Sequence, residues 1–375
     1  MKTVIISANS SWYLYNFRSS TILRLVKDGY KIVCISPKDK HTIKLENLGC
    51  EWFDLKMSNK GSNPFKDIRI VFRLFYLYVR FKPLAVYHFT IKNNIYGTWA
   101  AYLAGIPAIN NISGLGTAFI RKGFISYIVK ILYKLSQPLA YRVYCQNEED
   151  YQLLIDERLI PQQKLFLLPG SGVDTIRFNP NLVSETGSVF RFLFVGRLIG
   201  DKGLYELMEA IKKINCDEPI CHLWVCGFSK IDNISAISSK EIEEWQNLPG
   251  VVWIEPNDNI EQVMKDVNCI VLPSYREGMP KSLLEAGAMG LPSITTNVPG
   301  CRNIIQDKKN GLLCESRSSK SLELAMRTMI SMPERDLIKM GHSARKIIEK
   351  SFDEEIVINA AIEALQSIKI STSKI

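Results

Sequence analysis

Two glutamates eight positions apart, Glu277 and Glu285, flank a proline in the segment EGMPKSLLE. Pro280 suits the first turn of a helix, where its missing N–H would have no partner anyway, so we expect a helix to begin near this residue. Glu277 then lies in the preceding loop, and Glu285 lies about one and a half turns into the helix. Carboxylates only accept hydrogen bonds, so this pair suits a ligand rich in hydroxyl groups. Two solvated glutamates at a polar helix start are the alternative.

A glycine-rich loop carries two candidate anion-binding cations. The segment RFLFVGRLIGDKGLYELMEAI (191–211) runs from a strand pattern through this loop into a helix pattern. Arg197 and Lys202 therefore stand at a helix N-terminus, where backbone N–H groups and the helix dipole favour an anion. Two fixed cations there predict a diphosphate site. Two solvated loop cations are the alternative, since the loop is neither a Walker loop nor a G-x-G-x-x-G fingerprint.

The elements that must position these residues alternate between strand and helix patterns. In the first half, apolar runs such as TVIISA (3–8) and LAVYHF (84–89) are separated by helical spacing, and the second half repeats this from RFLFVG (191–196) onward. Such alternation predicts parallel, doubly wound sheets, and 375 residues suit two domains. PGSGVDTIRFNP (169–180) is the expected linker. We therefore expect a cleft at the carboxyl ends of both sheets.

The net charge of +9 arises in residues 68–147, which contain ten basic residues and no acidic one. This asymmetry predicts an anionic partner for the N-terminal half. Two segments, 65–83 and 119–142, mix basic and apolar residues at helical spacing, and neither has the ~18 uninterrupted apolar residues of a membrane span. They could lie at a lipid surface, with 119–142 favoured, or pack as ordinary helices with snorkelling cations. Nucleic-acid binding is a further alternative.

Cysteine usage and the N-terminus indicate the compartment. Nine cysteines form no C-x-x-C pair, which favours reduced thiols over a disulfide framework or a zinc site. MKTVIISANSSW is the expected first strand and lacks the cleavage-site pattern of a signal peptide. We therefore expect a cytoplasmic chain without a bound metal.

Together these segments resemble the retaining glycosyltransferases of family 4. VGRLIGDKG, LPSYREGMPKSLLEAGAMGLP, VPG and NGLL carry the resemblance, which covers nearly the whole chain and is most specific in residues 166–315. It implies the GT-B fold, an α/β architecture of two doubly wound Rossmann-like domains that face each other across a cleft. It implies an acceptor-binding, membrane-associating domain over 1–172, a nucleotide-sugar-binding domain over 173–352, and a C-terminal helix over 353–375 that packs back toward the first domain.

The resemblance also implies roles for the residues of the two motifs. Glu277 would hold the donor sugar and Glu285 the nucleotide ribose, while Arg197 and Lys202 bind the diphosphate. Arg197, Lys202 and Glu277 are the expected catalytic residues. Further donor-binding residues that it implies are Gly196, Gly278, Met279 and Lys281. The two cations and a helix dipole would neutralise the leaving diphosphate, which implies front-face, retaining transfer without a metal, a cofactor or a protein nucleophile.

The N-terminal half is similar to the branch that extends undecaprenyl-diphosphate-linked saccharides for O-antigen, capsule or protein glycans. NSSWYLYNFRSSTILRL, HFTIKNNIYG and NNISGLG carry this similarity. The expected acceptor-binding residues are Asn16, Arg18, His88, Lys92 and Ser113. Solvent-facing helix residues at 16 and 18 and a structural histidine at 88 are the alternatives. Ser113 stands where many members have a histidine, and Asn303 stands where relatives often have a glutamate.

The expected function is transfer of a hexose or N-acetylhexosamine, with GalNAc or GlcNAc as the expected sugar, from a UDP-sugar to an undecaprenyl-diphosphate-linked saccharide. The product would contain an α-glycosidic bond. We expect a peripheral protein on the inner face of the cytoplasmic membrane, whose basic stretch meets anionic lipid and not nucleic acid. A UDP-sugar 2-epimerase of the same fold and, less so, a nucleic-acid-binding protein are the alternatives.

Overall fold

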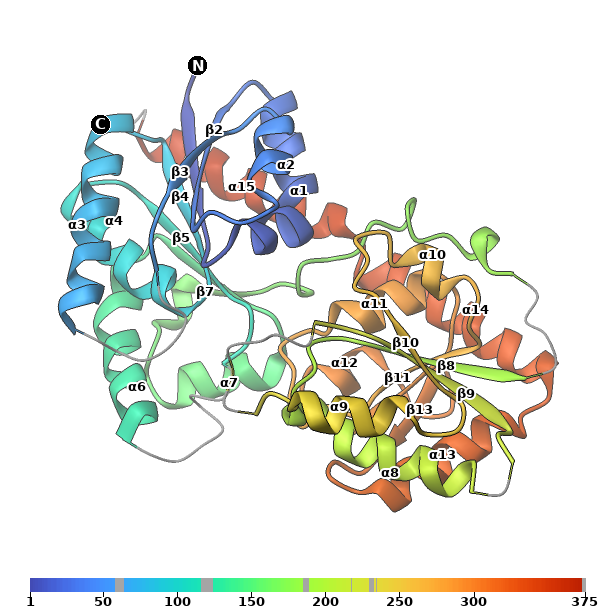
Figure 1. Ribbon diagram of the computed structural model, residues 1–375. Coiled ribbons are helices and arrows are strands. Elements are labelled where there is room, and N and C mark those ends of the chain that lie inside the picture. The colour runs from blue at the N-terminus through green and yellow to red at the C-terminus, as the bar shows by residue number, and fades with distance from the viewer. Residues whose placement is uncertain are drawn as a thin grey trace. The chain divides into compact units, whose positions relative to one another are not determined.

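The computed structural model divides into two compact units (Figure 1). Met1–Ser171 and Glu355–Ile375 form the N-terminal domain, and Gly172–Glu354 form the C-terminal domain. The described residues are 1–57, 64–115, 124–184, 189–216, 218–228, 233 and 235–372. The expected linker, 169–180, belongs largely to the C-terminal domain, because Val173 and Phe178 are buried in its core.

In the described part of the N-terminal domain, seven parallel strands form one sheet in the order β3-β2-β1-β4-β5-β6-β7. Their bounds are β1 Thr3–Ser7, β2 Lys31–Ser36, β3 Glu51–Asp54, β4 Ala85–Phe89, β5 Ala108–Ile112, β6 Arg142–Cys145 and β7 Leu165–Leu167. Successive side chains point to opposite faces of a strand. On β1, Val4 and Ile6 therefore enter one core and Ile5 enters another.

Helices cover both faces of this sheet. Their bounds are α1 Ser11–Lys27, α2 Thr42–Asn47, α3 Pro64–Phe81, α4 Thr98–Leu103, α6 Phe124–Ser136, α7 Glu148–Asp156 and α15 Glu354–Thr372. Leu14 of α1 and Leu365 of α15 pack in the core that holds Val4, whereas Leu74 of α3 and Tyr133 of α6 pack in the other core. The C-terminal helix α15 thus lies beside α1 and completes the N-terminal domain (Figure 1).

In the described part of the C-terminal domain, six parallel strands form a second sheet in the order β10-β9-β8-β11-β12-β13. Their bounds are β8 Phe190–Val195, β9 Cys221–Cys226, β10 Val251–Ile254, β11 Cys269–Leu272, β12 Ser293–Thr296 and β13 Gly311–Cys314. The helices are α8 Leu204–Ile214, α9 Ser239–Gln246, α10 Glu261–Met264, α11 Lys281–Ala288, α12 Cys301–Ile304, α13 Ser319–Ile330 and α14 Glu334–Ser351. The expected pair of doubly wound sheets is confirmed.

The strand order of the second sheet reverses at β8, which lies between β9 and β11. Open α/β sheets bind ligands beyond the carboxyl ends of their strands at such a switch point. The glycine-rich loop with Lys202 follows β8, and the loop with Glu277 follows β11. The topology therefore brings the two candidate motifs together, although 75 residues separate them in the sequence.

Among the described residues, no helix is long and apolar enough to cross a bilayer, and no group of three or more His, Cys, Asp or Glu residues could hold a metal ion. The nine cysteines, all within the described residues, form no disulfide, and all but Cys216 are buried. Residues 119–123 of the basic segment 119–142, including Arg121 and Lys122, lie outside the described residues, as do the side chains of Phe124 and Ile125.

Candidate active site

The glycine-rich loop is held close to the loop that follows β11. Gly203 has φ 74, in the left-handed region, and a Cβ atom at this position would lie 2.1 Å from the carbonyl oxygen of Pro273. Only glycine fits both this backbone conformation and this close approach. The loop before it begins at Gly196, whose N–H donates to the Cys226 carbonyl at 3.1 Å. Lys202 is thereby fixed just before α8.

Lys202 and Glu277 form an ion pair at the junction of the two loops. The Lys202 ammonium and the Ser274 hydroxyl, at 2.6 Å, both donate to Oε1 of Glu277. The Glu277 side chain is only 13% exposed and that of Lys202 only 16%. Because Oε1 accepts both bonds, Oε2 is the oxygen that Glu277 can offer to a ligand hydroxyl. Arg197, by contrast, is exposed, and its side chain forms no hydrogen bond or ion pair with the residues that the structure describes.

A second glycine supports the Glu277 loop from the opposite side. Gly300 has φ 80, and a Cβ atom there would lie 2.6 Å from the Glu277 carbonyl oxygen and 2.7 Å from that of Gly278. The side-chain oxygen of Asn303 accepts the Gly300 N–H at 2.8 Å. Asn303 therefore caps the short helix α12 beneath the Glu277 loop. Met279, the next residue after Gly278, packs against the domain core.

Tyr275 joins the same two loops and was missed in the sequence analysis. Its N–H donates to the Asp201 carbonyl at 3.0 Å, and its hydroxyl donates to both carboxylate oxygens of Glu206, at 2.7 and 2.9 Å. The Arg317 guanidinium lies 4.0 Å from the ring centroid. Burial and Glu206 raise the pKa of Tyr275, so the hydroxyl stays protonated and donates. Tyr275 and Glu206 come together through the pairing of β8 with β11, and no local sequence motif indicates their contact.

Glu285 lies on α11, which begins at Lys281 directly after its N-cap Pro280, as expected. The Glu285 carboxylate is 10% exposed, and its Oε1 atom lies 3.7 Å from the Lys281 ammonium. Burial raises the pKa of Glu285, although the Lys281 and Arg177 cations oppose the shift. Arg177 itself is paired with Glu261 at 2.7 Å. The second glutamate is therefore a buried carboxylate beside a cation, rather than a solvated surface group.

His88, expected at the acceptor site, is instead a core residue. Its side chain is fully buried, with Tyr78 Oη 2.9 Å from Nε2 and Asn110 Oδ1 2.9 Å from Nδ1. Asn110 Oδ1 can only accept, so Nδ1 carries the proton and Nε2 accepts from Tyr78. Burial lowers the pKa of His88 to about 4. The structural alternative for this histidine is the correct one, because β4 directs its side chain into the sheet core.

Arg18 also departs from the expected position, because its side chain is buried and only 2% exposed. Lys92 is paired with the buried carboxylate of Asp67 at 2.8 Å, and Tyr96 donates to the other oxygen of that carboxylate at 2.9 Å. The ion pair with Asp67 engages the Lys92 side chain within the domain. Three of the expected acceptor residues stay partly exposed: Asn16, Lys92 and Ser113.

Ser113 and Asn16 both lie close to the start of α1. The Ser113 and Tyr13 hydroxyl oxygens are 2.6 Å apart, and Asn16 Nδ2 donates to the Trp12 carbonyl at 3.0 Å. Ser113, which stands where many family members have a histidine, is thus hydrogen-bonded to Tyr13 of α1. Tyr13 is a further residue that the sequence analysis missed.

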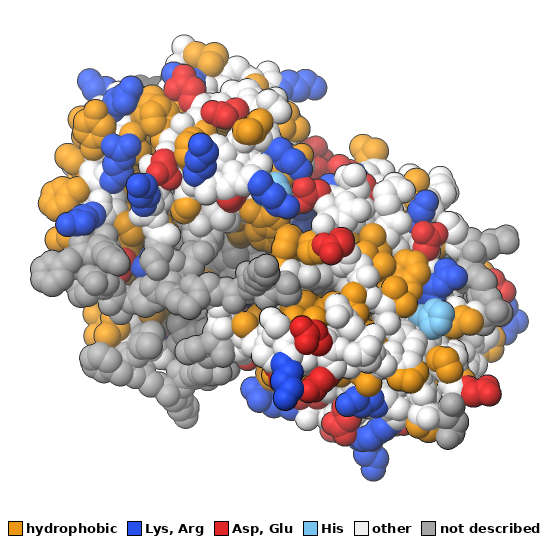
Figure 2. Space-filling view, in the orientation of Figure 1, with side chains coloured by type: hydrophobic (Ala, Val, Ile, Leu, Met, Phe, Trp, Pro, Cys, Tyr) orange, Lys and Arg blue, Asp and Glu red, His pale blue; other side chains and the backbone are white. Residues whose placement is uncertain are grey.

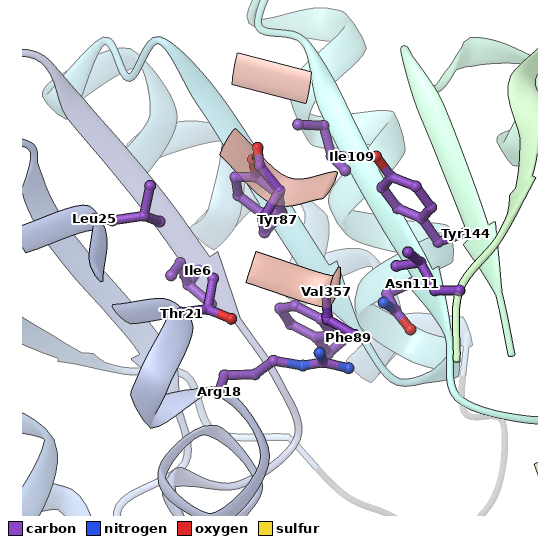
Figure 3. Close-up of a pocket in the computed structure, with 12 residues that line it drawn as sticks. Ile6, Arg18, Thr21, Leu25, Tyr87, Phe89, Ile109, Asn111, Tyr144 and Val357 are labelled. Atoms are coloured by element: carbon purple, nitrogen blue, oxygen red, sulfur yellow. Dashed lines mark hydrogen bonds between the residues drawn. The ribbon is translucent and has the colours of Figure 1, made fainter. Parts of the chain in front are cut away.

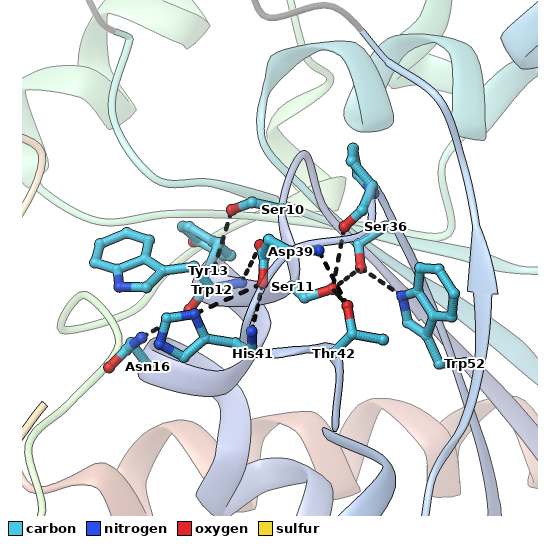
Figure 4. Close-up of polar contacts among 11 residues, drawn as sticks. Ser10, Ser11, Trp12, Tyr13, Asn16, Ser36, Asp39, His41, Thr42 and Trp52 are labelled. Carbon is cyan, nitrogen blue, oxygen red and sulfur yellow. Dashed lines mark hydrogen bonds and ion pairs between the residues drawn. The ribbon is translucent and has the colours of Figure 1, made fainter. Parts of the chain in front are cut away.

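A buried polar cluster fixes the loops that follow β1 and β2 (Figure 4). Ser11 Oγ lies 2.8 Å from Ser36 Oγ and 3.0 Å from Thr42 Oγ1. Asp39 accepts the backbone N–H groups of Trp12 at 2.8 Å and of His41 at 2.7 Å. The cluster holds the first turn of α1 in place, which in turn positions Tyr13 and Asn16.

Comparison with known proteins identifies the family. Residues 181–347 match the model of glycosyl transferases group 1, and residues 3–147 match the model described as glycosyl transferase 4-like. The chain belongs to the glycosyltransferases. Both site loops of this glycosyltransferase, with Lys202, Glu277 and Glu285, lie inside the first match. The nucleic-acid-binding and epimerase alternatives receive no support from these matches.

Two curated relatives are similar over most of the glycosyltransferase. A Campylobacter jejuni N,N'-diacetylbacillosaminyl-diphospho-undecaprenol alpha-1,3-N-acetylgalactosaminyltransferase is 25% identical over 360 residues, which cover 92% of this chain and 93% of the relative. An Escherichia coli UDP-Gal:alpha-D-GlcNAc-diphosphoundecaprenol alpha-1,3-galactosyltransferase is 27% identical over 67% of each chain. The crystal structure of Anabaena HepE in complex with UDP-glucose matches over 100% of both chains with a TM-score of 0.78 and 15% identity. The fold is therefore GT-B, as expected.

Proposed function

We propose that this glycosyltransferase moves a hexose or N-acetylhexosamine from a UDP-sugar to an undecaprenyl-diphosphate-linked saccharide and retains the anomeric configuration. Both curated relatives are named for alpha-1,3 transfer to such a carrier, one of GalNAc and one of galactose. GalNAc and GlcNAc are the donors we would test first. The observation that carries the proposal is the Lys202–Glu277 pair at the switch point of the second sheet.

The donor diphosphate would bind at the start of α8. Lys202 and the exposed Arg197 supply two positive charges there, and the free N–H groups at the start of the helix face the same anion. Glu277 would then share Lys202 with the diphosphate and accept sugar hydroxyls with its Oε2 atom. Glu285 would accept the ribose hydroxyls, which requires its ionised form. The two glutamates would thus hold opposite ends of one nucleotide sugar.

In the transfer step, the bond between C1 of the sugar and the diphosphate oxygen breaks as the acceptor oxygen bonds to C1 on the same face. The acceptor hydroxyl gives its proton to the departing phosphate oxygen, and UDP leaves. Lys202 and Arg197 would stabilise the negative charge that develops on that oxygen. The step as proposed needs no metal ion and no covalent intermediate on the protein.

The exposed face of α3 supports a membrane-associated acceptor. Ile68, Phe72, Tyr76 and Val79 are exposed and fall within about 80° of one another on the helix, at about 100° per residue. Three exposed cations lie along one side of this stripe: Arg69, Arg73 and Arg80. Figure 2 shows hydrophobic and basic side chains together over α3. Such a face would lie in the interface of an anionic bilayer, so we propose peripheral attachment at the inner face of the cytoplasmic membrane.

Transfer from a panel of UDP- and GDP-sugars to a defined undecaprenyl-diphosphate-linked saccharide, with EDTA present, tests this function. We expect a lipid-linked product from one UDP-sugar by mass spectrometry, with an α-linkage in its NMR coupling constants. Lys202→Ala is the matched inactive control. A β-linked product would contradict retention, loss of activity in EDTA would contradict metal independence, and transfer only to a soluble acceptor would contradict the lipid carrier.

A further inference from the structure

Arg177 lies on a segment of the C-terminal domain whose backbone is fixed by side chains. Its N–H donates to Asp174 Oδ1 at 2.8 Å. The Arg345 guanidinium of α14 donates to the carbonyl oxygens of Thr175, at 3.0 Å, and Phe178, at 2.7 Å. These two carbonyl groups lie on either side of residue 177 in the sequence. The position of Arg177 is therefore set independently of the contacts that its own side chain makes.

The Arg177 side chain pairs with a largely buried carboxylate. Its Nε atom, at 3.2 Å, and its Nη2 atom, at 2.7 Å, both donate to Oε2 of Glu261, whose side chain is 11% exposed. Nη2 also donates to the Asp258 carbonyl at 2.6 Å. A carboxylate buried to this extent costs free energy unless a cation pairs with it. Arg177 provides that cation at the start of α10.

Glu261 and Glu285 are two buried carboxylates of one charged cluster. The Glu285 side chain is 10% exposed, and the Lys281 ammonium on the same helix lies 3.7 Å from its Oε1 atom. Burial raises the pKa of Glu285. The Lys281 and Arg177 cations lower this pKa, whereas the Glu261 anion raises it. The two carboxylates repel each other, and the two cations balance their charge.

The other elements packed on α11 add little charge near Glu285. The strands β11 and β12 contain no charged residue. Arg345 of α14 donates to three backbone carbonyl groups, and Arg302 of α12 is exposed. The Arg177–Glu261 pair is therefore the source of charge from outside α11 that acts on Glu285.

The buried arginine of the N-terminal domain, Arg18, is held in a different way. Its guanidinium carbon lies 4.3 Å from the centroid of the Phe89 ring, and none of the described residues that line the adjoining cavity is acidic (Figure 3). Such an arginine contributes mainly packing. Arg177 differs because it pairs with Glu261, so its loss should change the balance of charge.

A carboxylate accepts hydrogen bonds from hydroxyl groups most strongly when it is ionised. We propose that Arg177 is a positioning residue for the donor nucleotide, which neutralises Glu261 and so keeps Glu285 charged to accept the ribose hydroxyls. This role rests on the proposed function, because ribose binding by Glu285 is part of it. Arg177 acts through the two carboxylates and does not contact the nucleotide. It therefore affects donor affinity and its pH dependence, and not the chemical step.

The pH dependence of the donor KM in Arg177→Met and in Glu261→Gln tests this role, because both changes break the same ion pair. Without Arg177 the charge of Glu261 is unbalanced, so the KM should begin to rise at a higher pH than in the wild type as the pH falls. Within that rise, the KM should exceed the wild-type value by roughly two- to fivefold, with kcat unchanged. Glu261→Gln should instead move the rise to a lower pH. Shifts in the same direction would overturn the proposal, because they would reflect only the loss of the bond.

Two further variants separate charge from structure. Arg327→Met is the matched control, because the Arg327 side chain is 43% exposed, against 41% for Arg177, and pairs with Glu323 in the same domain. Its KM profile should equal that of the wild type. Arg177→Lys keeps the positive charge and should also keep a profile close to that of the wild type. A profile displaced as far as that of Arg177→Met would contradict a role for the charge. If Arg177→Met does not fold, Arg177→Lys and Glu261→Gln still decide.

A direct titration of Glu285 distinguishes a failure of this proposal from a failure of the proposed function. In protein labelled with carbon-13 at the glutamate carboxyl groups, NMR follows the Glu285 signal without any nucleotide, and Glu285→Gln identifies that signal by its absence. The pKa of Glu285 should be higher in Arg177→Met and lower in Glu261→Gln than in the wild type. Equal pKa values in the three proteins would overturn the role of Arg177. The expected pKa shifts without any change in the donor KM profile would instead contradict ribose binding by Glu285.

Discussion

The two domains treat similar polar residues in opposite ways. In the C-terminal domain, Lys202 and Glu277 lie on loops that leave neighbouring strands, and both keep some exposure beside an exposed Arg197. In the N-terminal domain, His88 and Arg18 come from the interior of a strand and of a helix, and both are buried. Lys202 and Glu277 thus keep an exposure at the ends of strands that His88 and Arg18 lose inside β4 and α1.

Among the substitutions proposed for the loop residues and the buried residues, Lys202→Ala should lower the transfer rate most. Losing the cation that would face the leaving diphosphate should lower kcat by roughly 10²- to 10³-fold. Lys213→Ala is the matched control, because Lys213 lies at the other end of α8 and pairs with exposed Glu209. Steady-state transfer rates measure both. A rate for Lys202→Ala within a few fold of the control would remove Lys202 from the site.

Glu285→Gln should weaken donor binding by roughly 10- to 100-fold, because an uncharged amide replaces a carboxylate that accepts ribose hydroxyls. The pKa of Glu285 is raised above its ordinary value of 4.5, so the group takes up its proton at a higher pH than an exposed glutamate. The donor KM of the wild type should therefore increase as the pH falls toward that raised pKa. Glu285→Gln should lack this pH dependence. A donor KM that rises with falling pH as steeply in the variant as in the wild type would contradict the role of Glu285.

Tyr275→Phe should have a smaller effect, because Tyr275 acts through the loops that it joins. Removing its hydroxyl bond to Glu206 should lower kcat about fivefold, with little change in the donor KM or the melting temperature. Tyr205→Phe is the control, since that hydroxyl bonds to Glu241 on an exposed surface. A clearly lower melting temperature of Tyr275→Phe together with the lower kcat would indicate a structural role alone.

His88→Gln should leave the transfer rate at neutral pH unchanged. It should alter only how the stability of the N-terminal domain depends on pH in acid. The folded pKa of His88 is about 4, below its ordinary value of 6.5. Between these values the unfolded chain binds more protons, so the stability of the N-terminal domain falls as the pH decreases, by up to about 1.4 kcal/mol per pH unit. Denaturant unfolding at several pH values from 7 to 4 measures the free energy of unfolding. This free energy should fall less steeply with decreasing pH in the variant than in the wild type. A direct catalytic role would instead appear as lost activity at pH 7.

The sequence predicted the C-terminal site better than the N-terminal one for a physical reason. Glu277, Pro280 and Glu285 lie within one loop and helix, so local helix rules place them. The same rules give no account of Tyr275 and Glu206, whose contact depends on the pairing of β8 with β11. Local spacing placed the strands but could not tell which strand residues face a packed helix.

Tertiary contacts surround two of the residues that the sequence predicted at the acceptor site, His88 and Lys92. His88 ends in the core because Tyr78 of α3 and Asn110 of β5 meet it there, and neither is near it in the sequence. Lys92 pairs with Asp67, which lies just outside the acid-free stretch that drew attention to the basic residues. Partners of this kind appear only once the sheet order is known.

The transfer rate of Glu277→Gln at saturating UDP-sugar decides whether the Lys202–Glu277 ion pair belongs to the donor site. Glutamine keeps the shape of the side chain and removes the charge that pairs with Lys202 and would orient the donor sugar. With Glu209→Gln as the surface control and matched melting temperatures, the account predicts a fall in rate of at least roughly 100-fold. A rate equal to that of the control would contradict the claim that this ion pair forms the catalytic end of the donor site.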